Sequence, residues 1–174
     1  MKNKIILVIA SHDFQQVEYM DTKEELEKAN FEVITVSDES GDAVAKDCST
    51  TARIDLTLDE IDIEDYDAIY LIGGPGAMEY LDNEKMYAFL NKWKDSGKPF
   101  GSICISTRIL AKAGVLQGIQ ATGWNGDDEL PAVLVENGAD YVDTNVMTEG
   151  NITTASGPLA AHDFGREIVK VLTN

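Results

Sequence analysis

Short apolar runs of strand length are the feature that most restricts how this chain can fold. Residues 4–10 (KIILVIA) and 67–72 (DAIYLI) are almost continuously apolar, and residues 99–103 (PFGSI) form a shorter run. Such runs are typical of strands buried on both faces of a parallel sheet, because a strand with one wet face alternates apolar and polar residues. The chain therefore needs helices on both faces of its sheet.

Helical segments separate these runs. The sequence predicts helices at about residues 15–29, 84–96, 104–113, 128–137 and 158–172. It predicts further strands at residues 31–36, 118–122, 141–147 and 151–155, with short strands within 52–58. The alternation predicts an α/β fold with a doubly wound, mostly parallel sheet in one domain spanning residues 1–174.

Cys104 lies where a predicted strand meets a predicted helix. Ser102 and Ser106 stand two residues to either side, and small residues at this spacing are what the tight strand-to-helix turn of a nucleophile elbow requires. At a helix N-terminus, the free backbone N–H groups and the helix dipole favour the thiolate. An inert, buried cysteine is the alternative from this stretch alone, since free cysteine often packs as a small hydrophobe.

Gly73 and Gly74 follow the apolar run 67–72. They place unshielded backbone N–H groups at the carboxyl end of a strand, where open α/β sheets form their sites. A phosphate-binding loop would need a GxGxxG or Walker lysine pattern, and the sequence has neither. An oxyanion cradle fits this stretch better.

Charge and cysteine content exclude several functions. The chain has 14 Lys and Arg against 31 Asp and Glu, for a net charge of -17, which argues against nucleic acid and anionic membranes as partners. No apolar stretch approaches transmembrane length and the first run is short for a signal peptide, so the sequence predicts a cytoplasmic location. Two cysteines, Cys48 and Cys104, are too few for a disulfide framework.

Four segments in order resemble the ThiJ/PfpI superfamily, and most closely its PfpI-like branch of intracellular proteases and amidases. They are residues 14–33, 54–74, 97–118 and 137–158. The resemblance implies a flavodoxin-like sandwich that usually dimerises and that acts on a small molecule. We expect no cofactor and no metal.

The resemblance also implies a site. It maps the elbow cysteine to Cys104 and places Glu18, just after the first strand, beside the sulfur as a proton donor. It implies the backbone N–H groups of Gly74 and Ile105 as oxyanion donors. The loop after the first strand and the elbow should open at the same sheet edge, where burial should raise the pKa of Glu18. The alternative for Glu18 is an exposed carboxylate of a surface helix.

The sequence departs from the PfpI-like pattern after the cysteine. Ile105 stands where that branch has histidine, and isoleucine cannot accept a proton. Other branches place a histidine after the following strand, but Gly123 and Trp124 occupy those positions here. The triad acid would fall near Glu79. Candidates for the pocket wall are His12, Gly73, Trp124 and Asn125, and His162 is a less favoured candidate than His12. A surface acid is favoured as the partner of Arg108 over a substrate carboxylate or Glu18.

Two function classes follow. The first is a cysteine enzyme acting on a small electrophile, either an α-oxoaldehyde in glyoxalase or deglycase chemistry or a nitrile-like carbon in hydratase chemistry. Cys104 would attack and Glu18 would move the proton. The second is a redox sensor or stress protein in which Cys104 is oxidised to a sulfinate. Protease or amidase activity is disfavoured because Ile105 replaces the histidine.

Overall fold

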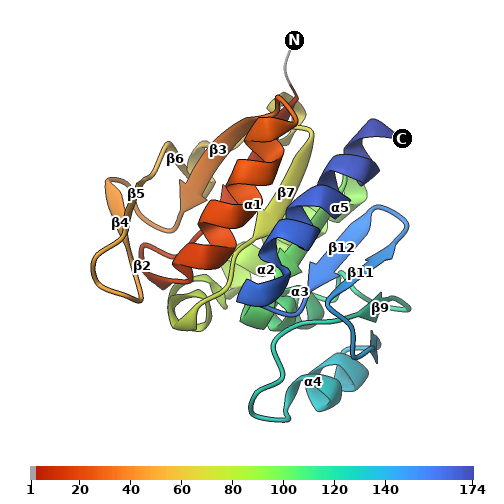
Figure 1. Ribbon diagram of the computed structural model, residues 1–174. Helices are drawn as coiled ribbons and strands as arrows, with labels where there is room; N and C mark the ends of the chain where they lie inside the picture. The colour runs from red at the N-terminus through yellow and green to blue at the C-terminus, as the bar shows by residue number, and fades with distance from the viewer. Residues whose placement is uncertain (1–2) are drawn as a thin grey trace.

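The computed structural model describes residues 3–174, and within them a seven-stranded sheet forms the centre of the molecule (Figure 1). Its strands, in spatial order, are β11 (Val146–Glu149), β12 (Ile152–Ala155), β8 (Phe100–Ile103), β7 (Ala68–Leu71), β1 (Lys4–Val8), β3 (Glu32–Ser37) and β6 (Leu56–Thr57). Every neighbouring pair is parallel except β11 and β12. The predicted doubly wound, mostly parallel sheet is confirmed.

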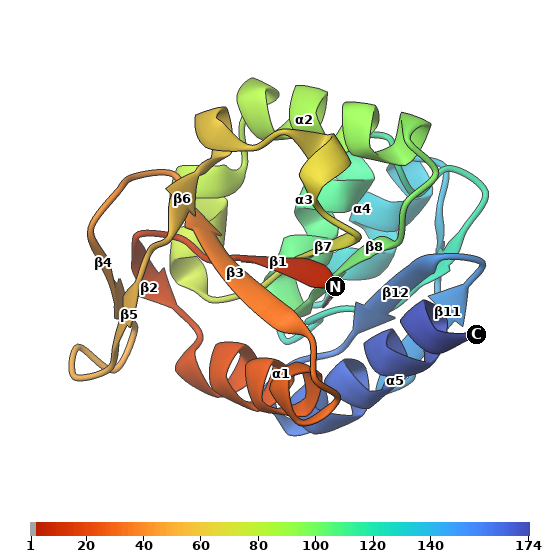
Figure 2. The ribbon, with the colours of Figure 1, turned by 90° about the horizontal axis from the view of Figure 1, so that it is seen from above.

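Helices cover both faces of this sheet. On one face lie α1 (Gln16–Lys28) and α5 (Ala161–Thr173), and on the other lie α2 (Glu84–Asp95), α3 (Thr107–Lys112) and α4 (Leu130–Glu136), as Figure 2 shows. Two apolar cores result, one on each side. Within residues 3–174, no helix combines the length and the apolar character needed to cross a membrane.

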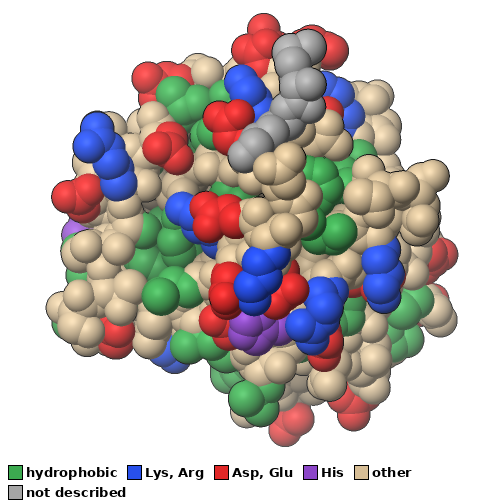
Figure 3. Space-filling model, turned by 45° about the horizontal axis from the view of Figure 1, so that its top comes forward, with side chains coloured by type: hydrophobic (Ala, Val, Ile, Leu, Met, Phe, Trp, Pro, Cys, Tyr) green, Lys and Arg blue, Asp and Glu red, His purple; other side chains and the backbone are tan. Residues whose placement is uncertain are grey.

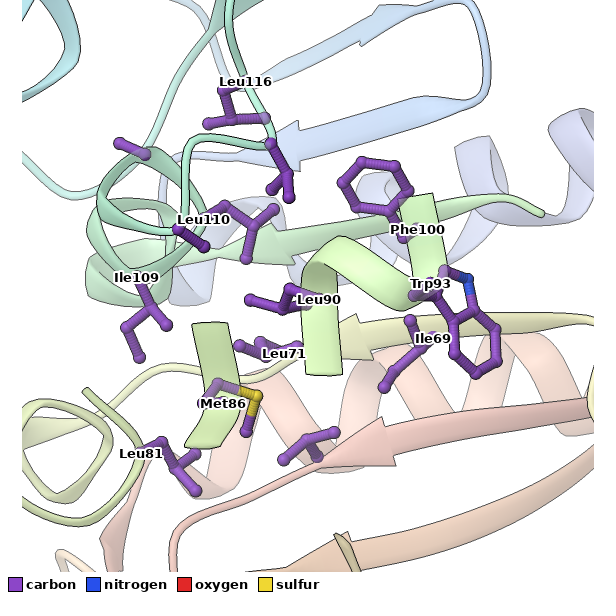
Figure 4. Close-up of a cluster of buried hydrophobic side chains, with 14 of the residues drawn as sticks. Ile69, Leu71, Leu81, Met86, Leu90, Trp93, Phe100, Ile109, Leu110 and Leu116 are labelled. Carbon is purple, nitrogen blue, oxygen red and sulfur yellow. The ribbon is translucent and has the colours of Figure 1, made fainter. Parts of the chain in front are cut away.

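The packing of α2 explains why its stripe of large apolar residues is structural. Met86, Leu90 and Trp93 are fully buried and pack in one cluster with Phe100 of β8 (Figure 4). The Trp93 indole N–H donates to the carbonyl of Pro99 at 3.1 Å, so its polar atom is satisfied. Burial of each such side chain contributes about 1.5–3 kcal/mol, which fixes α2 on the sheet.

The polar segment 37–64 holds structure that the sequence left undefined. Its strands β4 (Asp42–Ala45) and β5 (Thr51–Arg53) form a hairpin that joins β2 (His12–Phe14) in a small separate sheet. We predicted only a polar turn at β2, because three residues carry too little pattern to define a strand. This small sheet lies beside the loop that follows β1.

The predicted strand 141–147 is wrong as a single element. Its first part pairs as β10 (Asp140–Tyr141) with β9 (Gln120–Ala121), and its last part begins β11. A turn, in which the Thr144 N–H donates to the Val142 carbonyl, separates the two. Likewise Pro158 begins a 3₁₀ turn, and α5 starts only at Ala161.

A network of charged groups joins α1 to α5 on the outer face, where acidic and basic side chains surround a histidine (Figure 3). His162 lies 2.9 Å from Glu25 through Nδ1 and 3.4 Å from Asp21 through Nε2. Arg166 adds a contact of 3.6 Å to Glu25. His162 therefore connects two helices and does not line the pocket described below.

Candidate functional site

Three loops meet at the carboxyl edge of the sheet. Because β1, β7 and β8 are parallel neighbours, the segments that follow them emerge on the same side. Glu18 comes from α1 after β1, Gly73 and Gly74 follow β7, and Cys104 follows β8. Strand order alone thus brings together residues separated by up to 86 positions in the sequence.

Cys104 has a backbone conformation that few residues other than glycine adopt. Its φ is +65°, in the left-handed region, and such strain is found where a turn is held by its surroundings. The holding groups are buried hydroxyls: Ser106 donates to the Ile72 carbonyl at 2.7 Å, and Ser102 pairs with Thr107 at 2.9 Å. The small residues around the cysteine therefore build the sharp turn predicted for an elbow.

Glu18 is fully buried, so it is not the exposed helix carboxylate that was the alternative. Its Oε2 accepts the N–H of Gly73 at 2.9 Å, and its carboxyl group also hydrogen-bonds to the side chain of Cys104. Burial raises the pKa of Glu18 from 4.5 to about 7, against the opposing effects of these two hydrogen bonds and the charge of Lys46. A glutamate in this position holds its proton at pH values where surface carboxylates are ionised.

The Cys104 sulfur faces opposing influences. The pKa of the Cys104 thiol is raised well above its ordinary value, first by burial and then by the neighbouring Glu18 carboxyl, and the hydrogen bonds from the backbone N–H groups of Ile105 and Gly74 oppose this rise only in part. A buried thiolate and a buried carboxylate that lie side by side cannot both be charged, so the pair of Cys104 and Glu18 retains one proton near neutral pH. When Glu18 holds that proton, the two N–H groups are left to stabilise a thiolate.

Gly73 is packed so tightly that no side chain fits at this position. A Cβ added there would lie 2.6 Å from Cys104 Cβ, 2.7 Å from Glu18 Oε2 and 3.0 Å from Cys104 Sγ. The Gly73 carbonyl also accepts the N–H of Gln15 at 2.9 Å, which ties the first loop to the second. The backbone of Gly73 is thus the spacer between the acid and the thiol.

A pocket of about 260 Å³ opens over this arrangement. Its lining residues are Gln15, Glu18, Lys46, Gly74, Pro75, Cys104, Ile105, Trp124 and Pro158. The volume suits a small molecule, and the wall is largely apolar. Sequence reasoning missed Lys46, which lies in the turn between β4 and β5; no local motif marks it, and only the pairing of β4 with β2 brings it to the pocket.

Three of the four predicted pocket residues do not line the pocket: Gly73 lies beneath it between Glu18 and Cys104, and local partners hold His12 and Asn125 elsewhere. His12 is exposed, contacts Tyr80 with tilted rings whose centroids are 5.8 Å apart, and lies 3.2 Å from the Ser11 hydroxyl through Nδ1. The Asn125 side chain accepts the N–H of Leu130 at 3.0 Å at the start of α4. Neither is among the lining residues, whereas Trp124 is.

Arg108 pairs with acids near the surface, as predicted. Its guanidinium lies 2.5 Å from Asp127 and 3.4 Å from Glu129, and 5.5 Å from the ring of Trp124. These contacts hold the loop that carries Trp124. Glu79 is exposed and does not line the pocket.

Comparison with known proteins shows the family to which the chain belongs. The DJ-1/PfpI family profile matches residues 3–171, nearly the whole chain. The chain belongs to the DJ-1/PfpI family. A deglycase of Pyrococcus horikoshii is 32% identical over 169 residues, which cover 96% of this chain and 98% of the deglycase. The predicted superfamily is confirmed.

Solved structures of DJ-1/PfpI proteins share the fold. A ThiJ/PfpI domain protein of Brachyspira murdochii superposes with a TM-score of 0.92 at 29% identity, covering 98% of this chain and 96% of its own. Oxidised DJ-1 of Toxoplasma gondii gives a TM-score of 0.85 at 28% identity, covering 99% of this chain and 91% of its own. The flavodoxin-like fold expected from the resemblance is therefore shown.

Proposed function

We propose that this DJ-1/PfpI protein is a cysteine-dependent enzyme that converts small α-oxoaldehydes, or the early adducts they form with amines and thiols, into 2-hydroxy acids. The observation that carries the proposal is the buried Glu18 carboxyl beside Cys104, with two backbone N–H groups directed at the sulfur. The deglycase name of the Pyrococcus relative points to the same substrate class.

The first step is addition of the Cys104 thiolate to the aldehyde carbon. A C–S bond forms, and the carbonyl electron pair moves to oxygen, where the N–H groups of Gly74 and Ile105 stabilise the developing charge. Glu18 gives its proton to that oxygen, which completes a hemithioacetal. Gly74 and Ile105 serve this step because they already donate to the sulfur in the resting site.

The later steps use Glu18 as a base. The carboxylate removes the proton from the carbon bonded to sulfur, giving an enediolate whose hydroxyl proton moves to the neighbouring oxygen. Glu18 then returns its proton to the adjacent carbon, and the product is the thioester of a 2-hydroxy acid. Water then hydrolyses the thioester, which releases the acid and restores the thiol. The net reaction adds one water to the oxoaldehyde and consumes no oxidant; from an adduct, the C–N or C–S bond to the amine or thiol breaks as Cys104 binds that carbon, and the amine or thiol leaves with the proton from Glu18.

Amide or peptide hydrolysis is not proposed. That chemistry uses a base paired with the cysteine and an acid to protonate the leaving amine, and histidine usually fills these roles. Ile105 occupies the position next to the cysteine, and no histidine lies among the residues that line the pocket. Glu18 is the acid–base group that the described part of the site offers.

The test is product formation from methylglyoxal. We expect lactate in many-fold molar excess over protein, detected by NMR, with loss of turnover in Cys104→Ala and in Glu18→Gln. Cys48→Ser, which removes the exposed thiol, is the matched control and should retain activity. Equal lactate formation by the Cys104→Ala variant would overturn the proposal.

The redox alternative uses the same sulfur and gives a different result. A sensor would form no lactate, and mild peroxide would add two oxygens to Cys104 while leaving the exposed Cys48 unchanged. Mass spectrometry of tryptic peptides reads both sites in one measurement.

We further propose that two copies of the chain associate through α1. Val17 and Met20 of this helix are 40% and 54% exposed, and Leu159, in the 3₁₀ turn that packs against α1, is fully exposed. Large apolar side chains gathered on a surface favour association. A second copy is the partner that this pairing implies.

A further inference from the structure

Lys46 is the one positively charged residue among those that line the pocket over Cys104. The other ionisable groups of the lining are Glu18 and Cys104, which the proposed chemistry already uses. Lys46 has no role in that chemistry. Its presence calls for an explanation in terms of what enters the pocket.

The backbone of Lys46 is held in place. Its N–H donates to the Phe14 carbonyl at 3.0 Å, which anchors the turn between β4 and β5 to the small sheet beside α1. The next residue, Asp47, accepts the N–H groups of Ser49 and Thr50 at 3.0 and 2.8 Å and closes that turn. These hydrogen bonds fix the backbone at Lys46, while its side chain is exposed.

The charge of Lys46 is not neutralised by the protein. Across residues 3–174 it forms no ion pair, although the chain contains 31 Asp and Glu, and six other lysines do pair. Its field nevertheless reaches the site, since it opposes the rise in the pKa of Glu18. An unpaired ammonium group at the mouth of a small, mostly apolar pocket is a recognition point for an anion.

We propose that the pocket selects small substrates that carry a carboxylate, with that carboxylate bound by Lys46 and the reactive carbonyl placed over Cys104. A carboxylate is favoured over a phosphate dianion because the pocket offers one ammonium group and no arginine. The enzymatic part of this inference rests on the proposed function, but the selection of negative charge does not.

A pair of alkylating reagents tests the charge selection without turnover. Iodoacetate and iodoacetamide are nearly equal in size and react with the same thiolate, but only iodoacetate is negative. In a Cys48→Ser background, the ratio of their rates at Cys104 reports the local charge. Any change in the pKa or intrinsic reactivity of the thiol alters both rates and cancels in the ratio.

We expect Lys46→Gln to lower the iodoacetate-to-iodoacetamide ratio about fivefold, as a unit charge several Å away predicts. Lys46→Arg should preserve it. Lys92→Gln, which removes an exposed lysine of α2 far from this pocket, controls for net charge and should leave it unchanged. A ratio in Lys46→Gln equal to that in Lys92→Gln would overturn the proposal.

A second measurement separates this inference from the proposed function. With 4,5-dioxovalerate, an α-oxoaldehyde that bears a carboxylate, Lys46→Gln should reduce kcat/KM about fivefold relative to methylglyoxal. If neither compound is turned over while the alkylation ratio still falls, the proposed enzyme activity fails and the anion selectivity stands. If both are turned over with unchanged preference, the activity stands and the role of Lys46 is refuted.

Discussion

Replacing Glu18 by glutamine should abolish one defined part of the pH dependence of stability. The folded protein holds the Glu18 pKa at about 7, against 4.5 for an ordinary carboxyl group. Between these two values the folded state binds more protons than the unfolded state, so stability falls as pH rises. Glutamine keeps an oxygen that can accept the Gly73 N–H and has no proton to lose.

The expected magnitude follows from the shift. The difference between the folded and unfolded pKa values of Glu18 corresponds to about 3 kcal/mol of unfolding free energy, which is fully lost only above the folded pKa. Roughly 2.5 kcal/mol of this is lost between pH 5 and pH 8. Because Glu18 is fully buried, solvent screening does not reduce this figure appreciably. This loss is large compared with the unfolding free energy of a typical domain, which is about 5–15 kcal/mol.

Urea unfolding at several pH values between 5 and 8 measures this effect. Both chains should carry Cys104→Ser, which removes the titration of the coupled thiol, so that only Glu18→Gln distinguishes them. All other titrating groups then cancel in the difference. Glu27→Gln, an exposed position of the same helix, is the matched control and should give a flat difference.

A constant difference between the two chains across this pH range would refute the reasoning. It would mean that Glu18 ionises in the folded state as easily as in the unfolded chain. The assignment of Glu18 as proton donor to a carbonyl oxygen would then fail as well, because an ionised carboxylate has no proton to give.

Three further changes have outcomes that the structure specifies. Gly73→Ala should destabilise the protein by about 1–3 kcal/mol in urea unfolding and slow alkylation of Cys104, because the added methyl overlaps the cysteine and Glu18; unchanged values would show that the loop yields freely. Tyr70→Phe should raise stability by about 1 kcal/mol, because the Tyr70 hydroxyl is buried with no hydrogen-bond partner in residues 3–174; a loss would reveal a partner for that group. Leu159→Asp should shift the protein to monomers in sedimentation equilibrium, because it places a charge in the 3₁₀ turn beside the exposed apolar residues of α1; an unaltered mass would place any interface elsewhere.

The fold was predictable because each buried strand carries its own signal. Residues 4–10 and 67–72 are apolar throughout, and their parallel order sets where the following loops lie. The elbow was readable for a similar reason, since Ser102 and Ser106 leave room for the turn at Cys104. These are local properties, which a sequence displays directly.

Residues placed by distant contacts were not predictable. Lys46 reaches the pocket because β4 pairs with β2 across some thirty intervening residues, and neither strand has a strong pattern. His12 and Asn125 stood close to the expected site in sequence, but Tyr80 and the first turn of α4 hold their side chains elsewhere. Side-chain direction depends on such partners, which spacing does not reveal.

The residues that line the pocket come from two parts of the fold, because the small sheet of β2, β4 and β5 contributes Lys46. Cys104 follows β8 of the main sheet and Glu18 lies on α1, which packs on that sheet, whereas Lys46 lies in the turn of a separate hairpin. Substitutions in the turn at residues 46–50 can therefore change which molecules are admitted without displacing Cys104 or Glu18, although loss of the Lys46 charge also removes its lowering effect on the pKa of Glu18.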